Sequence, residues 1–435
     1  MIRLWSVKSR SAADQYRMIK VLIPILFLAL ASAGHPAWAL STVSSEVLER
    51  MALYGNTRIR SRVILREIGL FPGKSFDTKI LNRERAWLLR QDFLQRIEFQ
   101  VKPGSIENGR VLILIVQEKP VWSMNPIINE NDLFGWTAGL TLTRTNLGGF
   151  RNRIDLSGQM GGIDRLTLAW SNPWFGGPLR LFGQAEIGIT RYRYLFGDVD
   201  TPFDDAEAGF LFGLGIRPAR PIRLGCRIGI DWISVSDSRF AVSGGRADTL
   251  VWTEPFLLLD SRDWPYYPKT GFVIHAWFRS TRTWSRDLFR RAGVDFRMYR
   301  PAFKDNIIAF QTEIQISDGQ VPAYRRIHLG GGKTIRGFPI GALAGEHSVL
   351  AAVEYRFPLV YERNPLAGIH AGYAGVLFLD AGTAWFGTEP FLVKNLRLSA
   401  GFGVHAIWDH WVIRLEYGHN GEGWGFVRAG TGTKF

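Results

Sequence analysis

The residues most able to form a chemically defined site are charged side chains in glycine-rich or apolar surroundings. Arg336 lies in the stretch HLGGGKTIRGFPIGA (328–342), just after three consecutive glycines. Asp380 and Glu354 stand on the polar faces of segments whose polarity alternates. A guanidinium and a carboxylate that are withdrawn from water form a geometrically defined, charge-assisted pair. The alternative interpretation of Arg336 is a solvated loop arginine.

The sequence shows no constellation that is typical of catalysis. Its eight histidines are scattered without metal-ligand spacing, and no Gly-x-Ser-x-Gly nucleophile elbow occurs. A hydrolase site hidden inside the fold would need a serine, a histidine and an acid at matched depth, and no such set stands out. We therefore predict that the protein is not an enzyme and requires no cofactor and no metal.

The charged residues lie on segments that alternate in polarity with a period of two. In SVLAAVEYRF (348–357), Val349, Ala351 and Val353 share one face, and Glu354 lies on the other. Such strands build either a sandwich, with the apolar faces as its core, or a membrane barrel, with the apolar faces against lipid. Blocks of about ten residues, 13% aromatic residues and a secretory leader favour an all-β transmembrane β-barrel of about sixteen antiparallel strands. The strands are expected near 120–129, 135–144, 152–160, 164–171, 179–190, 205–217, 221–235, 250–260, 271–282, 286–299, 306–317, 346–357, 374–385, 396–408, 411–419 and 424–435.

Residues 1–39 have the pattern of a secretory signal peptide. An apolar run, Val21 to Ala33, follows basic residues and precedes the small-residue site AWA, which ends at Ala39. An uncleaved anchor is the alternative, although the run is shorter than the roughly 20 residues of a spanning helix. Translation from Met1 and translation from Met18 both fit the pattern. Cleavage removes five basic residues and one acidic residue, so the net charge falls from +14 to +10.

The remaining basic charge also limits the partners. On an exported chain it favours anionic lipid or lipopolysaccharide over nucleic acid. The arginine-rich run from Arg279 to Arg300 suits a lumenal or loop position, with lipopolysaccharide contact as the alternative. Cys226 is the single cysteine, which excludes an internal disulfide, and its place on an apolar strand face predicts a packing role.

The sequence pattern of residues 43–119 differs from that of the expected barrel strands. SEVLERMALYGN predicts a strand, RSRVILREIGL and DTKILNRERAWLLRQDFL have helical spacing, and RIEFQVKP and RVLILIVQEKP predict a strand pair. This order predicts a small soluble α+β domain ahead of the barrel, which occupies 120–435.

Several motifs, taken in order, resemble the outer-membrane protein assembly factor superfamily, which includes BamA-type and TamA-type insertases and two-partner secretion translocators. Segments YGNTRIRSRVILREIGLFPGKSF, LLRQDFLQRIEFQV and GRVLILIVQEKP resemble a single polypeptide-transport-associated (POTRA) domain. RTNLGGFRNRIDLSG and LAWSNPWF are similar to early barrel strands, and LDSRDWPYYPKTGF is similar to a turn midway along the barrel. GGGKTIRGF, VEYRFPL and FLDAGTAW are similar to the sixth loop and the two strands after it. The final Phe435 is also a familiar ending of bacterial outer-membrane barrels.

The resemblance implies that the tip of this loop folds back into the barrel lumen. There Arg336 would meet Asp380 on the strand wall, with Glu354 nearby on the preceding strand. Ile335 replaces the valine that is commoner in the family. The expected loop lock consists of Ile335, Arg336, Gly337, Phe338, Glu354, Asp380 and Gly382.

The resemblance further implies a protein of the bacterial outer membrane, with the POTRA-like domain in the periplasm, that inserts or translocates client polypeptides. Because glycine weakens a strand, we expect the first and last barrel strands to form a seam that opens laterally and exposes an edge to the client. Expected partners are client outer-membrane or secreted polypeptides, outer-membrane lipid or lipopolysaccharide, and periplasmic accessory proteins, but no nucleic acid. The seam residues are Val121, Trp122, Gly425, Gly430 and Phe435, and the client-docking edge of the POTRA-like domain is Ile97, Phe99 and Val101.

Two alternatives remain for the function. The barrel could secrete a dedicated passenger through its lumen, or it could act as a passive pore. A single POTRA-like domain is fewer than the several of a typical BamA-type insertase, which counts against a central housekeeping role.

Overall fold

The computed structural model describes residues 46–91, 93–130, 134–192, 204–364, 369–408, 411–423 and 425–435. The predicted signal peptide, residues 1–39, lies outside this part of the chain. In the described part, no helix has the length and apolar character that a membrane span requires.

The N-terminal module, residues 46–118, is a four-stranded sheet with two helices. Its elements are β1 Glu46–Tyr54, α2 Ser61–Leu65, β2 Ser75–Phe76, α3 Thr78–Leu89, β3 Leu94–Pro103 and β4 Gly109–Glu118. The strand order is β2-β1-β4-β3, with β1 and β4 parallel and β3 antiparallel to β4. Its core includes the fully buried Leu48, Val63 and Leu88. The α+β prediction is confirmed, except that β2 was not expected, because two residues are too few to show an alternating pattern.

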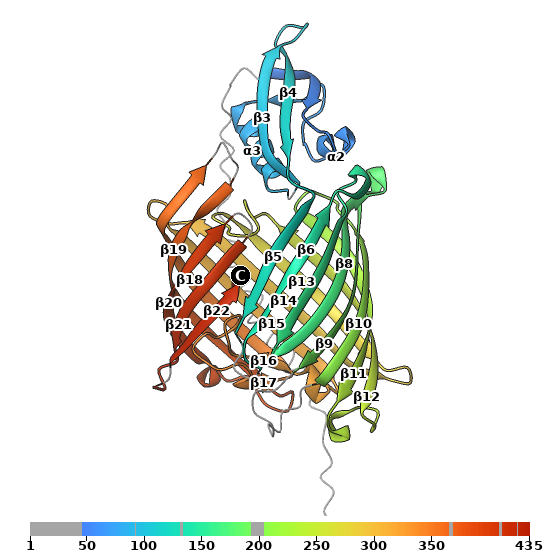
Figure 1. Cartoon of the computed structure of the whole chain (residues 1–435), viewed down its shortest axis with the longest axis vertical. Coiled ribbons are helices and arrows are strands. Elements are labelled where there is room, and N and C mark those ends of the chain that lie inside the picture. The colour runs from blue at the N-terminus through green and yellow to red at the C-terminus, as the bar shows by residue number, and fades with distance from the viewer. Residues whose placement is uncertain are drawn as a thin grey trace, which may run out of the picture. The chain divides into compact units, whose positions relative to one another are not determined.

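The rest of the chain forms a closed barrel of sixteen antiparallel strands (Figure 1). Neighbours in sequence pair with one another except at two places: β15 pairs with β18, and β22 closes the ring against β5. This confirms the predicted fold class and strand number. The wall strands are β5 Trp122–Asn129, β6 Thr137–Thr145, β7 Arg153–Gly161, β8 Ile163–Phe175, β9 Leu181–Tyr192, β10 Asp204–Ile216, β11 Ile222–Val235, β12 Ala247–Asp260, β13 Gly271–Arg282, β14 Asp287–Pro301, β15 Ile307–Gly319, β18 His347–Asn364, β19 Ile369–Trp385, β20 Arg397–Trp408, β21 Trp411–His419 and β22 Gly425–Thr431.

The connections hold the remaining elements. A two-stranded sheet of β16 (Ile327–Leu329) and β17 (Leu343–Gly345) lies in the loop between β15 and β18. One-turn 3-10 helices occur at η1 Leu147–Gly149, η2 Gly177–Leu179, η3 Ser238–Phe240, η4 Ala323–Arg325 and η5 Val393–Asn395.

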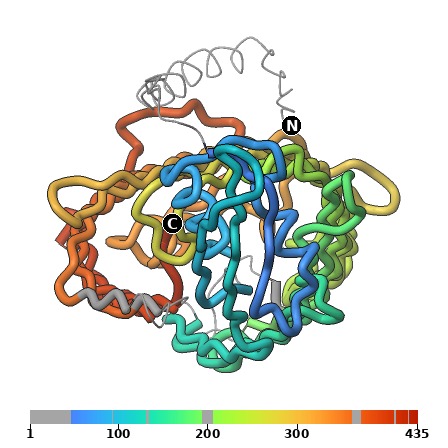
Figure 2. The backbone as a smooth tube through the Cα atoms, turned by 90° about the horizontal axis from the view of Figure 1, so that it is seen from above, coloured from blue at the N-terminus to red at the C-terminus, as the bar shows by residue number. Residues whose placement is uncertain are grey.

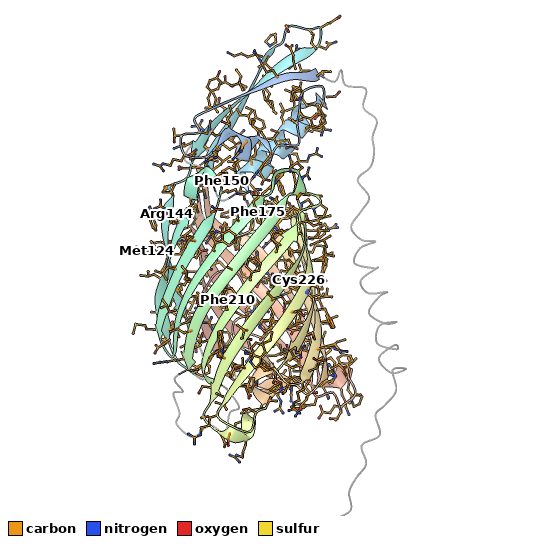
Figure 3. The ribbon with its side chains drawn as sticks, turned by 90° about the vertical axis from the view of Figure 1, so that its right-hand side faces the viewer. Met124, Arg144, Phe150, Phe175, Phe210 and Cys226 are labelled. Atoms are coloured by element: carbon orange, nitrogen blue, oxygen red, sulfur yellow. The ribbon has the colours of Figure 1, made fainter. Side chains whose placement is uncertain are left out.

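Alternation along each strand sorts side chains between the outer and the inner surface of the wall. On β20, Leu398 and Phe402 are exposed on the outside, whereas Ser399 and His405 are buried inside. The exposed Cys226 lies on the apolar outer surface, as does Phe210 (Figure 3). An apolar exterior around a polar interior is the arrangement of a barrel whose outer face contacts lipid.

The last strand differs from its prediction. The chain was expected to continue as a strand to residue 435, but β22 ends at Thr431. Gly432 has a φ of +80°, which an L side chain rarely adopts and glycine adopts freely, so the chain turns at this point. The last residues enter the barrel, and the C-terminus lies inside the ring of strands (Figure 2).

Candidate functional site

The loop between β15 and β18 returns into the barrel and places Arg336 at its tip. Backbone hydrogen bonds shape this tip: the N–H of Gly331 donates to the carbonyl of Phe338 (2.9 Å), and that of Phe338 donates to Ile335 (3.2 Å). Gly330 and Gly331 have φ values of +124° and +79°, so the turn requires glycine there. Arg336 is fully buried as a result.

Three carboxylates from strands β18, β19 and β21 hold the Arg336 guanidinium. Nε and Nη2 donate to the two oxygens of Asp380 on β19, at 2.9 and 2.8 Å. Nη1 donates at 2.7 Å both to Glu354 on β18 and to Glu416 on β21. The guanidinium also lies 3.4 Å from the centre of the Phe378 ring. Such charge-assisted and cation–π contacts are strong where water is excluded.

A second set of cations surrounds the same carboxylates. Arg356 contacts Glu354 at 2.7 Å, and Arg414 contacts Glu416 at 2.7 Å. Lys434, the penultimate residue, contacts Asp380 at 2.5 Å. We call this buried set the Arg336 cluster; its members are Arg336, Glu354, Arg356, Asp380, His405, Arg414, Glu416 and Lys434.

The other residues expected in the loop lock pack around this cluster. Ile335 and Phe338 belong to an apolar group with Leu350 of the wall. A Cβ added to Gly382 would lie 3.0 Å from the Ile335 side chain, and one added to Gly337 would lie 2.6 Å from Ser399. These two glycines therefore allow the loop to approach the wall closely.

Asp380 and Glu354 belong to the residues predicted from the sequence, whereas Glu416 and Lys434 do not. Glu416 lies on the inward face of WVIRLEYGH, so the same alternation carried a signal for it. Lys434 carried no such signal, because its position depends on the turn at Gly432.

The junction of the first and last barrel strands is the most weakly paired part of the wall. In the described residues, β22 and β5 are joined by one residue pair, Gly430 with Asn129. A backbone bond from Glu130 N to Ala429 O, at 3.4 Å, adds to it. By contrast, seven residue pairs join β21 to β22 and eight join β5 to β6. We call this junction the seam.

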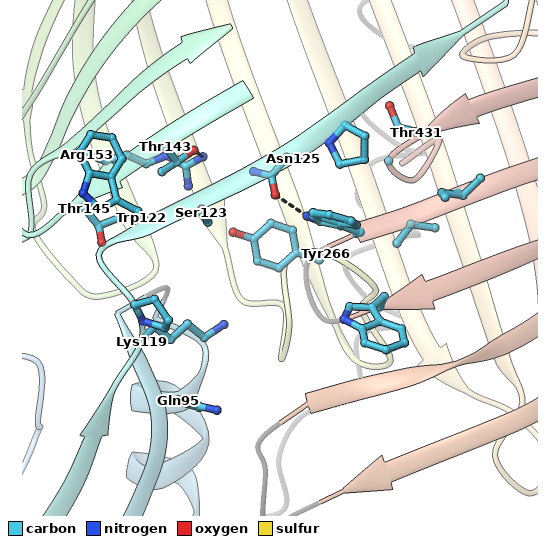
Figure 4. Close-up of a pocket in the computed structure, with 17 residues that line it drawn as sticks. Gln95, Lys119, Trp122, Ser123, Asn125, Thr143, Thr145, Arg153, Tyr266 and Thr431 are labelled. Atoms are coloured by element: carbon cyan, nitrogen blue, oxygen red, sulfur yellow. Dashed lines mark hydrogen bonds between the residues drawn. The ribbon is translucent and has the colours of Figure 1, made fainter. Parts of the chain in front are cut away.

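Side chains bridge the seam where the backbones do not. The indole of Trp411 donates to the Asn125 side chain, the bond drawn in Figure 4. Arg428 contacts Glu130 at 3.4 Å. A cavity of about 480 Å³ lies beside these contacts, and its lining includes residues of β5, β6 and β21, Thr431, and Gln95 and Lys119 of the N-terminal part (Figure 4).

The predicted seam residues do not all lie at the seam in the structure. Gly430 pairs directly across the seam, and Trp122 begins β5. Val121 precedes that strand, and Gly425 begins β22, where it pairs with His419 of β21 instead of β5.

Phe435 does not lie at the seam. It is 1% exposed and packs against Tyr299, Ala309 and Ala352 on the inner wall, while its carbonyl accepts a bond from Arg356 at 3.4 Å. The expectation that Phe435 closes the last strand is therefore wrong in this structure. An apolar pocket and the ion pair of Lys434 hold the end of the chain in the lumen instead.

The strand expected to dock clients lies at the edge of the module sheet. In the part of the chain that the structure describes, β3 pairs with β4 on one side and with no strand on the other. Ile97 is buried in the module core, Phe99 packs partly against it, and Val101 is 39% exposed. The free side of β3 thus offers backbone groups and an exposed side chain together.

The arginine-rich run divides between the inner wall and the barrel ends. Arg279 contacts Glu254 at 2.6 Å, and Arg297 contacts Asp295 at 2.5 Å. Among the described residues, no group of three or more His, Cys, Asp or Glu side chains is arranged to hold a metal ion.

A model of the Omp85 superfamily domain matches residues 146–421. The chain belongs to the Omp85 superfamily. This agrees with the resemblance that the loop and strand motifs indicated. Members of the superfamily are bacterial outer-membrane proteins that act as transporters or assembly factors.

Solved structures share the fold at low sequence identity. BamA from Haemophilus ducreyi lacking POTRA domains 1–3 is 16% identical, with 89% of this chain and 84% of that chain covered and a TM-score of 0.55. CdiB from Escherichia coli is 11% identical, with 98% and 100% covered and a TM-score of 0.59. CdiB from Acinetobacter baumannii is 11% identical, with 89% and 74% covered and a TM-score of 0.56. No curated protein matches the sequence.

Proposed function

We propose that this protein inserts client polypeptides into the outer membrane through lateral opening of the seam. The weak pairing of β22 with β5, one residue pair among the described residues, carries this proposal. A strand edge with unpaired N–H and C=O groups is a template on which another strand adds by backbone pairing. Burial of the client's apolar surface in lipid supplies the free energy, so the reaction needs no nucleotide.

The N-terminal module acts in this proposal as a POTRA-like domain in the periplasm. Its free β3 edge, with Phe99 and Val101, binds an extended client segment before transfer to the seam. Its segment after β4 leads directly into β5, so module and seam are adjacent along the chain. The Arg336 cluster keeps the remaining wall rigid while the seam opens.

A covalent bond across the seam tests the proposal. Asn129→Cys and Gly430→Cys place two thiols on directly paired residues, and a Cβ at Gly430 meets no atom closer than 3.6 Å. Cys226, which is exposed, is replaced by alanine in all variants. The oxidised protein is expected to stay folded but to stop inserting an unfolded eight-stranded outer-membrane barrel into vesicles, and reduction should restore insertion.

The matched control joins two strands that do not form the seam. Leu415→Cys with Ala429→Cys bonds β21 to β22, which are already paired, and should leave insertion unchanged. Full insertion by the oxidised seam variant would exclude lateral opening. Continued release of a secreted passenger from the same locked protein would instead support secretion through the lumen, and passage of small solutes alone would support a passive pore.

A further inference from the structure

An ion-pair network joins the N-terminal module to the barrel. The carboxylate of Glu67, which is fully buried, accepts from Arg151 at 2.8 Å and from Arg217 at 3.1 Å. Arg220 contacts Glu84 at 2.7 Å, and these contacts link helix and turn residues of the module to the loops at one end of the barrel. These ion pairs hold in place the module residues that line one side of a basic cavity.

This cavity lies between the module and the inner faces of β9, β11 and β12 and has a volume of about 290 Å³. Six arginines line it, and we call it the arginine cavity. Among the described residues, four carboxylates form ion pairs with these arginines, namely Glu67, Glu84, Asp155 and Asp260. The arginines are Arg90, Arg151, Arg153, Arg217, Arg220 and Arg223.

Arg223 is the arginine of this cavity that an anion can reach. It projects from the inner face of β11 and remains accessible to solvent. Within the described part of the chain, Arg223 has no hydrogen bond and no ion pair. Arg217 beside it has a buried Nε without an acceptor. A buried guanidinium donor without an acceptor, such as the Arg217 Nε, is costly, and an anion that enters the cavity offsets that cost.

We propose that the arginine cavity binds carboxylate groups of an acidic segment in the client polypeptide, with Arg223 as the contacting guanidinium. The proposal rests on the proposed function, because it assumes an unfolded client. The planar guanidinium fork matches a carboxylate with two parallel bonds. The cavity is lined by residues of the module and of the inner wall, away from the lipid-facing outer surface, and its volume suits acidic side chains.

A binding measurement on the full-length protein in detergent micelles tests the site. The probe is an unstructured peptide of about ten residues, rich in aspartate and labelled with an uncharged dye, and the comparison peptide has asparagine at each aspartate position. Fluorescence anisotropy is expected to show binding of the acidic peptide alone. Arg223→Gln should weaken it roughly tenfold, the effect of one lost charge-assisted contact.

The control variant is Arg286→Gln, which removes the same charge from the exposed turn between β13 and β14 and should bind as the unaltered protein does. Arg223→Lys keeps the charge without the fork, and we expect intermediate binding. Equal binding of both peptides, or unchanged binding by Arg223→Gln, would overturn the proposal. If the protein binds a free dye that pyrophosphate displaces but does not bind the acidic peptide, the cavity would be assigned to phosphate groups. That result would also overturn the proposal.

This design measures folding and peptide binding separately. Migration of unheated protein on gels reports whether each variant retains its barrel. The protein with an oxidised seam should bind the acidic peptide normally, so a failure of lateral opening leaves this result untouched.

Discussion

Replacement of Asp380 by alanine is expected to destabilise the barrel more than replacement of Arg336. Without Arg336, each carboxylate of the Arg336 cluster keeps another cation: Glu354 keeps Arg356, and Asp380 keeps Lys434. Without Asp380, the buried Lys434 loses its carboxylate, and Arg336 loses three of its hydrogen bonds. The two variants therefore leave unequal amounts of uncompensated buried charge.

The expected magnitudes follow from that difference. Removal of one partner of a buried ion pair costs about 3–5 kcal/mol, most of it from the charge left behind. We place Arg336→Ala near the lower end, about 3 kcal/mol, and Asp380→Ala near the upper end, about 5 kcal/mol. Adding Lys434→Met to Asp380→Ala removes the stranded ammonium and should restore part of the loss.

Equilibrium unfolding in urea, followed by tryptophan fluorescence in detergent micelles, measures these free energies. Lys333→Ala, in the same loop but exposed, serves as the control and should change the free energy of unfolding by less than about 0.5 kcal/mol. A double-mutant cycle between Arg336 and Asp380 should give a coupling of about 0.5–3 kcal/mol. Additive effects, or a larger loss from Arg336→Ala than from Asp380→Ala, would refute the reasoning.

Three further outcomes are expected. Gly337→Ala should cost about 1–3 kcal/mol in the same unfolding assay, because its Cβ would lie 2.6 Å from Ser399, whereas Gly332→Ala, with 3.7 Å to the nearest atom, should cost little. Burial raises the pKa of Glu67, but Arg151 and Arg217 lower it more, so the pKa lies below the ordinary value of 4.5. The distribution of spin-label distances between module and barrel should therefore stay narrow above pH 4.5 and broaden only below it. Broadening already at pH 6 would contradict this. A peptide that binds the β3 edge should lose binding when its backbone nitrogens are methylated on alternate residues, and equal binding of the methylated peptide would exclude backbone pairing.

The strand positions were predictable because alternation is a local signal that lipid outside and water inside impose on every strand. β13, Gly271–Arg282, and β21, Trp411–His419, have the bounds that the pattern gave. The positions of Arg336 and Asp380 needed the family resemblance as well, since alternation shows which way Asp380 points but not which loop meets it.

The features that were not predicted from the sequence depend on contacts between segments that are far apart along the chain. The direction of the last residues is decided by Asp380 and by the apolar pocket around Tyr299, so the pattern near Phe435 gave the wrong position. Alternation does place Arg223 on an inward face, but the arginine cavity exists only because the module brings Glu67 and Arg90 to the same end of the barrel.

The Arg336 cluster also sets an order in which the wall can assemble. Its bonds to Arg336 and Lys434 close chain segments of 18 to 80 residues, whereas the bridges across the seam close segments of 286 and 298 residues. The longer closure costs roughly 1–2.5 kcal/mol more in chain entropy and returns few bonds. We therefore expect the carboxyl-terminal strands and their loop to become a fixed unit first and the ring to close last, through an open intermediate whose free edges are those that the seam would expose in the proposed function.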